Sequence, residues 1–107
     1  MIEAAATTQP TTAEPQGGPE ATRLIARARA LLGQGNISAA RIVLERAVEA
    51  GSALASFTLA ETYDPVVLST WGTYGTRGDA RKARQLYAKA HAGGIADAKD
   101  RLEELDH

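Results

Sequence analysis

The sequence predicts an all-α domain, built as a short stack of about five to six helices in antiparallel pairs. Apolar residues recur at helical spacing from about residue 20 onwards, and capping residues and glycines divide the chain into helix-length segments. Alanine dominates the apolar residues, and such small side chains let helices approach closely. The 107 residues suffice for one domain with one modest core.

Composition also narrows the function classes. The net charge of −1 provides no global field for nucleic acid or an anionic membrane, and the absence of Cys excludes thiolate catalysis and disulfides. No stretch approaches the roughly 20 apolar residues that a membrane span needs. We expect no cofactor, no metal site, no nucleic-acid partner and no membrane span in this chain.

Residues 1–19 differ in composition from the rest of the chain. They contain three of the four prolines and no aromatic residue. Such a segment buries too little surface to offset its ordering entropy. We expect a disordered arm or linker here, followed by a helical domain at 20–107.

Two helices are predicted before residue 51. Gly33 and Gly35 end the first, whose apolar face comprises Leu24, Ile25, Ala28, Leu31 and Leu32. Asn36 caps the second and Gly51 stops it. The apolar face of that helix comprises Ile37, Ala40, Val43, Leu44, Ala47 and Val48.

Ser52 is expected to cap a third helix, whose apolar side comprises Ala53, Ser56, Phe57, Ala60 and Tyr63. Asp64 followed by Pro65 is a strong helix-start signal. The helix it begins must be short, because three glycines follow: Gly72, Gly75 and Gly78.

Asp79 is expected to cap a fifth helix that runs to about Ala92, where Gly93 and Gly94 end it. Residues 95 to about 105 form a last, more polar helix, as the end of a stack requires.

An internal repeat extends the fold prediction. When the chain is shifted by 43 residues, residues 35–59 align without gaps on 78–102, and eight of the 25 positions are identical. Asn36 aligns with Asp79 as a cap, and Leu44 aligns with Tyr87 as a large core residue. A repeated helical hairpin cannot bury its apolar face alone, so it stacks on its neighbour. The identical pairs are Gly35/Gly78, Ala40/Ala83, Arg41/Arg84, Ala47/Ala90, Gly51/Gly94, Ala53/Ala96, Ala55/Ala98 and Leu59/Leu102.

In these units the chain resembles the tetratricopeptide repeat family. The first unit matches that family's order of large and small residues at Leu24, Ala28, Leu31, Gly35, Ala40, Leu44 and Ala47. The second matches at Leu59, Ala60, Tyr63, Gly78, Ala83, Tyr87 and Ala90. Arg27 replaces the usual Leu, and Gly94 stands where proline is common.

The long glycine-containing connection after Tyr63 is closer to the Sel-one-like variant of the family. The resemblance covers about residues 22–105 and implies a right-handed α-solenoid. It places units at about 22–51 and 52–94, an inserted loop at 64–78 and a capping helix at 95–106. The resemblance implies that the matched residues, together with Gly51 and Gly94, have structural roles in the repeat.

The segment from 64 to 79 departs from the repeat and carries the only Trp. Trp, Tyr and Arg are enriched at interface hot spots, so Trp71, Tyr74 and Arg77 are candidate partner contacts. Arg81 and Lys82 extend this candidate surface onto the fifth helix. For Trp71 alone we favour the alternative that the ring fills the gap between adjacent repeats, because one large ring occupies much of an alanine-rich core.

Other residues have structural interpretations. The spacing of the three glycines at 72, 75 and 78 fits no phosphate-binding motif and favours turns. His91 is expected to be partly buried at a helix end, and Glu45 and Glu49 to lie on a solvated face. Basic residues gather around the fifth helix and could contact an acidic peptide, a phosphate or RNA. The alternative is a structural role, such as pairing with an acidic neighbour, because Arg41 and Arg84 recur at equivalent places. Ile42 and Leu54 fall off the apolar faces and would mark a partner surface if they lie together.

The resemblance implies a non-catalytic scaffold that binds a peptide or partner protein in a helical groove. The alternative is a self-associating assembly or regulatory module of a larger protein, such as a homodimer or a bacterial envelope component. A remote alternative is an enzyme whose 64–79 loop binds an anionic substrate. We expect a cytoplasmic location for the chain as given, and a periplasmic one if it belongs to a longer exported protein.

Overall fold

The fold is described from a computed structural model, for residues 17–73 and 75–106. These residues form six helices, which confirms the all-α prediction. They are α2 (Gly18–Gly33), α3 (Ile37–Glu49), α4 (Ala53–Tyr63), α5 (Pro65–Trp71), α6 (Ala80–Ala92) and α7 (Asp97–Leu105). Most of the predicted arm lies outside the described residues, and α2 begins at Gly18, two residues before the boundary we expected.

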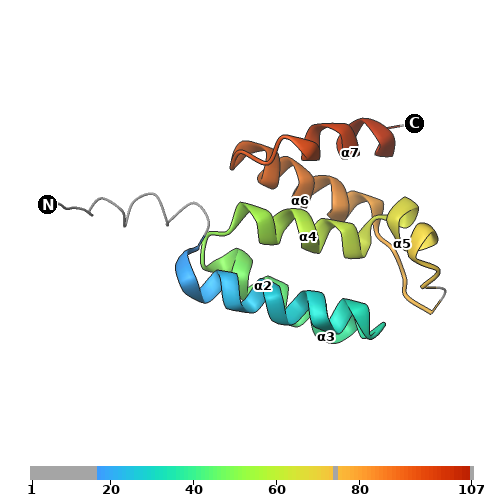
Figure 1. Ribbon diagram of the computed structural model, residues 1–107. Helices are drawn as coiled ribbons and strands as arrows, with labels where there is room; N and C mark the ends of the chain where they lie inside the picture. Colours follow the sequence, from blue (N-terminus) through green and yellow to red (C-terminus); the bar gives the residue numbers. More distant parts are fainter. Residues whose placement is uncertain (1–16, 74, 107) are drawn as a thin grey trace, which may run out of the picture.

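Helices that are neighbours in the chain pack against one another (Figure 1). The most extensive contacts join α2 to α3 and α4 to α6, while α3 also packs on α4 and α7 on α6. The short α5 contacts α4 and lies at one end of the molecule, beside the loop that leads to α6. The molecule is therefore a compact set of paired helices with α2 and α7 on opposite sides of α4 (Figure 1).

The four predicted N-caps are confirmed. Asn36 accepts a hydrogen bond from the Ala39 amide, and Ser52 accepts one from the Ala55 amide. Each such bond satisfies one of the free amides in the first turn of a helix. The other two predicted caps act in the same way: Asp64 accepts from the Val66 amide at 2.9 Å, and Asp79 from the Lys82 amide at 3.1 Å.

The core consists of two apolar clusters that meet at α4. One cluster joins α2 and α3 to α4, and the other joins α6 and α7 to α4. The prediction of a single apolar side for α4 was wrong, because Thr58, Leu59 and Thr62 are buried as well as Ala53, Ser56 and Ala60. Since α4 lies between two helix pairs, it is covered on nearly every side, and its small residues permit this close packing.

The two aligned segments share much of their local geometry. The helices α3 and α6 are both 13 residues long. The first and last residues of α3, Ile37 and Glu49, align with the first and last residues of α6, Ala80 and Ala92. Gly51 and Gly94 both adopt positive φ angles, of 102° and 103°. Aligned core residues are fully buried in both segments: Ala40/Ala83, Leu44/Tyr87, Ala47/Ala90 and Ala55/Ala98.

The aligned pair Gly35 and Gly78 differs in its physical role. Gly35 has a φ of 78°, a left-handed conformation that favours glycine. Gly78 lies in a close approach instead, because a Cβ added there would lie 3.0 Å from the Tyr63 carbonyl oxygen. The same carbonyl accepts a hydrogen bond from the Asp79 amide at 2.7 Å, which ties the start of α6 to the end of α4.

Candidate functional site

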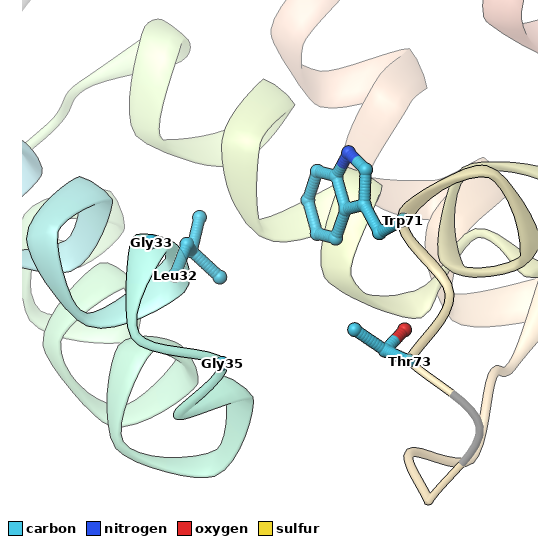
Figure 2. A pocket seen from close by; sticks show the side chains of 5 residues that line it. All are labelled: Leu32, Gly33, Gly35, Trp71 and Thr73. Atoms are coloured by element: carbon cyan, nitrogen blue, oxygen red, sulfur yellow. The ribbon is translucent and has the colours of Figure 1, made fainter.

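Three adjoining cavities form one groove along α4, which we call the α4 groove. The first, of about 440 Å³, lies between the end of α2 and the end of α5, with Leu32 and Trp71 on opposite sides (Figure 2). The second, of about 460 Å³, is also lined by Leu32 and Trp71. It continues along α4 and reaches Asp97 at the start of α7. The third, of about 210 Å³, shares Arg29 and Leu54 with the second. The full lining is Thr22, Ile25, Ala26, Arg29, Leu32, Gly33, Gly35, Leu54, Phe57, Thr58, Glu61, Trp71, Thr73 and Asp97.

Trp71 lies at the wall of this groove and is 40% exposed. The interpretation that it fills the gap between helix pairs was therefore wrong. The buried residue of α5 is Leu68. Because α5 follows α4 after a single residue and spans only seven residues, it buries one apolar side chain and leaves its final residue at the surface. Gly72, in a left-handed conformation, ends the helix directly after the indole.

The floor of the groove is apolar and its edges are charged. Leu32, Leu54 and Phe57 are half-buried and pack against the two cores, so they present apolar surface above a fixed base. Arg29 lies on the α2 side, and Asp97 lies at the start of α7. Thr58 and Glu61 also line the second cavity, so the groove combines apolar and polar surface, as ligand-binding sites do.

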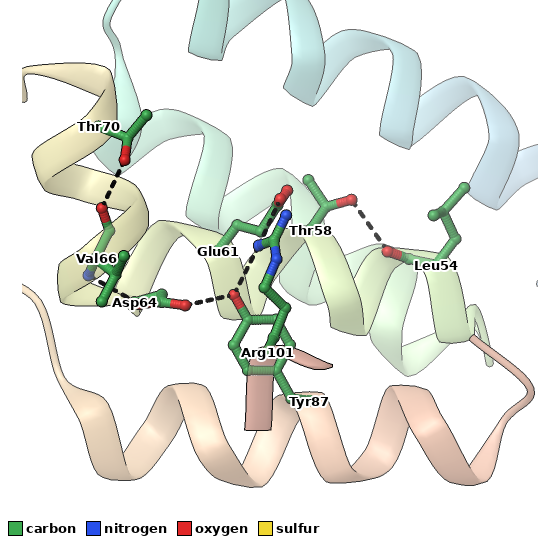
Figure 3. A network of polar contacts seen from close by, with 8 residues as sticks. All are labelled: Leu54, Thr58, Glu61, Asp64, Val66, Thr70, Tyr87 and Arg101. Atoms are coloured by element: carbon green, nitrogen blue, oxygen red, sulfur yellow. Dashed lines mark hydrogen bonds and ion pairs between the residues drawn. The ribbon is translucent and has the colours of Figure 1, made fainter. Parts of the chain in front are cut away.

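One wall of the groove is held by a polar network that joins four helices (Figure 3). The Tyr87 hydroxyl donates to Asp64 Oδ2 at 2.8 Å and accepts from Arg101 Nη1 at 3.1 Å. The same Arg101 nitrogen forms an ion pair with Glu61 Oε2 at 2.9 Å. The network therefore connects α7 to α4, α5 and α6 through buried and half-buried side chains.

Burial shifts the titration of two members of this network. Burial raises the pKa of the Glu61 carboxyl above its usual value, although the neighbouring Arg101 guanidinium opposes the shift. Burial, together with donation to Asp64, raises the pKa of Tyr87 far above its usual value. Tyr87 is therefore a neutral hydrogen-bond donor at neutral pH, and the network has a structural character.

Arg101 also stacks on the floor of the groove. Its guanidinium carbon lies 5.0 Å from the centre of the Phe57 ring, and Phe57 itself packs against Tyr87 at 5.5 Å between ring centres. Contacts of this kind stabilise the ring orientation. The floor is thus positioned by the same residues that hold α7.

A second polar cluster fixes the loop between α5 and α6. Arg41 donates to the Thr62 hydroxyl and carbonyl at the end of α4, and to the Arg77 carbonyl at 3.0 Å. Its guanidinium carbon also lies 3.8 Å from the centre of the Tyr63 ring. Arg41 therefore serves as a structural residue, but through carbonyl oxygens, not through the acidic neighbour we expected. Arg84 does have an acidic partner, Asp106, at 3.4 Å.

The structure does not bring the predicted partner-binding residues together in the groove. Trp71 lines it, whereas Arg77, Arg81 and Lys82 line none of its three cavities. Arg77 and Arg81 are exposed, and the Lys82 ammonium lies 4.9 Å from the Tyr63 ring centre. Tyr74 lies outside the described residues.

Sequence reasoning missed most of the groove. Arg29, Phe57, Glu61 and Asp97 were not predicted as site residues, because their convergence depends on how α2, α4 and α7 pack. One signal was present, since Leu54 falls off the predicted apolar face and lines the groove.

Three further expectations concern exposed side chains. Ile42, which is 64% exposed, lines none of the groove cavities, so it does not form a common surface there with Leu54. His91 is exposed, and the expectation of partial burial was wrong. Glu45 and Glu49 are exposed, as expected.

Across residues 17–73 and 75–106, no three His, Asp or Glu side chains are grouped so that they could hold a metal ion. None of the helices in these ranges is both long enough and apolar enough to cross a membrane. No family model, curated protein sequence or solved structure matches this chain.

Proposed function

We propose that this chain is a non-catalytic tetratricopeptide-like module, of the Sel-one-like type, that binds a peptide or a segment of a partner protein in the α4 groove. The observation that carries the proposal is the exposed Trp71 ring beside the apolar floor of the groove. A Trp side chain can bury about 150–250 Å² on binding, which makes it a strong anchor. Hot-spot residues are typically aromatic side chains of this kind at the centre of an interface.

The repeat assignment is supported by the paired local geometry. The equal lengths of α3 and α6, the matched burial of aligned core residues and the positive φ angles of Gly51 and Gly94 agree with two related units. The groove is also lined from α2, α4 and the start of α7, which are the first helices of the two proposed units and the capping helix. In such stacks the extended concave surface is the usual binding surface.

The groove is preorganised for binding. Its floor residue Phe57 is held by Arg101, and the helix that carries Trp71 begins at the buried Asp64. Because these supports are already in place, a ligand loses less free energy to ordering the site. This argument favours recognition of an apolar side chain between Trp71 and the floor.

The proposal is tested with peptides selected from a random display library on the full chain. Selected peptides are synthesised and titrated by calorimetry against wild type and Trp71→Ala. We expect the substitution to weaken binding by at least about 2 kcal/mol, the usual loss at a hot spot. Circular dichroism checks that the fold is retained, which we expect because the ring is 40% exposed.

Ile42→Ala is the matched control, because Ile42 is a large exposed apolar residue that lines none of the groove cavities. Its affinity for the same peptides should equal that of the wild type. If Trp71→Ala binds as well as the wild type, or if Ile42→Ala loses as much affinity, the groove is not the binding surface.

A further inference from the structure

The two helices that flank the α4 groove carry opposite charge. On the α2 side there are three arginines, Arg23, Arg27 and Arg29, against the single acid Glu20, and all four are exposed. On the α7 side there are four acids, Asp97, Asp100, Glu103 and Glu104, against two bases. These helices lie on opposite sides of α4, so the charges are separated across the molecule (Figure 1).

Both charged helices reach the groove itself. Arg29 of α2 and Asp97 of α7 line the same cavity, across the floor formed by Leu54 and Phe57. On α7, Glu104 follows Asp97 by two helical turns and therefore lies on the same face. On α2, Arg29 lies on the same helix face as the groove-lining Thr22, Ile25 and Ala26. The groove thus has a basic edge, an apolar floor and an acidic edge.

We infer that a second copy of this chain occupies the groove, forming a dimer with two-fold symmetry. In such an interface each surface patch meets its own equivalent, so residue i contacts j while j contacts i. A two-fold axis that runs along the groove, parallel to α4, sets the basic edge of one protomer against the acidic edge of the other, and does so twice. The apolar floors and the two Trp71 rings come together between these edges.

The charge pattern selects the second copy over an unrelated segment. A different partner needs an apolar stripe with acids on one side and bases on the other to match both edges. A second copy supplies that pattern when the two-fold axis runs along the groove. Complementary charge of this kind fixes orientation and rejects a copy in the reverse register, in which like charges meet. Small domains also gain stability from association, because each buries a limited fraction of its own surface.

This inference rests on the proposed function, because it names the partner of the same groove. It is tested by sedimentation equilibrium of the full chain at increasing concentration. The variant Arg29→Glu makes both edges acidic, and Asp97→Lys/Glu104→Lys makes both edges basic. We expect the wild type to dimerise, and each variant alone to have a dissociation constant at least about tenfold higher. A 1:1 mixture of the two variants should recover the dimer, because every edge then meets an edge of opposite charge.

The matched control is Arg46→Glu, which changes the net charge as much as the first variant at an exposed residue that lines none of the groove cavities. It should dimerise like the wild type. Trp71→Ala should weaken the dimer at unchanged charge. Higher salt should weaken the wild-type dimer, because exposed charges are screened.

A wild-type chain that is monomeric up to millimolar concentration overturns the inference. So does a dimer that both charge variants retain, or a mixture that fails to re-form it. If the chain is monomeric but still binds selected peptides through Trp71, the inference fails while the proposed function stands. If the chain neither dimerises nor binds peptides, both fail.

Discussion

The Tyr87 hydroxyl provides the most direct test of the polar network, because Tyr87→Phe deletes one atom and keeps the ring. Tyr87 is fully buried, and its hydroxyl contacts both Asp64 and Arg101. Without it, Asp64 Oδ2 loses the Tyr87 hydrogen bond at a position that is 1% exposed. Hydrogen bonds to charged groups contribute about 1.5–3 kcal/mol, so we expect the free energy of unfolding to fall by about 2–3 kcal/mol.

That loss is large for a domain of this size. Total stability is about 0.05–0.15 kcal/mol per residue, so a chain of this length holds about 5–15 kcal/mol. The midpoint of thermal unfolding should fall by about 10 °C. Urea unfolding followed by circular dichroism measures the change in the free energy of unfolding. If this free energy falls with urea concentration at the same slope in both proteins, the same structure unfolds in each.

Tyr63→Phe is the matched control. Within the described part of the chain, the Tyr63 hydroxyl makes no hydrogen bond, while its ring contacts Arg41 and Lys82. Removing the Tyr63 hydroxyl should therefore lower the free energy of unfolding by less than about 0.5 kcal/mol. If Tyr87→Phe is no more destabilising than Tyr63→Phe, the network does not hold the four helices together.

Two further predictions concern titration and packing. Because burial raises the pKa of folded Tyr87 far above the unfolded value of 10.0, the unfolded chain loses this proton first. The free energy of unfolding should therefore fall as the pH rises above 10.0, by up to about 1.4 kcal/mol per pH unit. Tyr87→Phe removes this contribution. If the free energy of unfolding falls equally steeply with pH in the wild type and in Tyr87→Phe, Tyr87 is not the group responsible. Gly93→Ala places a Cβ 2.5 Å from the Ala53 Cβ and should cost about 1–3 kcal/mol in urea unfolding. Gly33→Ala has no neighbour within 4 Å and should be neutral or slightly stabilising, so similar values for the two would refute the packing argument.

The sequence predicted the features that depend on local chemistry. The caps at Asn36, Ser52 and Asp79 were found because a short polar side chain must accept from an amide two or three residues later, which is visible in the sequence itself. The limits of α6 followed from its cap and from the glycines after Ala92. These are contacts within one turn of a helix, and packing elsewhere changes them little.

The features that the sequence did not predict depend on the packing of separate helices. The burial of α4 on nearly all sides requires two helix pairs that approach it together, and a single apolar stripe does not indicate this. The exposure of Trp71 depends on the short length of α5, whose one buried residue is Leu68. Likewise, Arg29 and Asp97 line one cavity although they are far apart in the chain. Hydrophobicity and spacing alone do not determine such convergence.

The differences between the two aligned segments explain why the network exists where it does. In the first, the fully buried Leu44 is apolar and needs no hydrogen-bond partner. Its aligned residue, Tyr87, carries a hydroxyl into an equally buried place, where an unpaired polar group would be costly.

Two side chains satisfy that hydroxyl. Arg101 aligns with Thr58 of the first segment, and Asp64 begins the short helix α5. The helix α5 is therefore tied to the rest of the domain, because its N-cap Asp64 contacts the buried Tyr87 of the second segment. Since α5 ends at Trp71, the contact that satisfies the core also fixes the helix that forms the groove wall. In this protein the same residues therefore support both the buried network and the candidate binding surface.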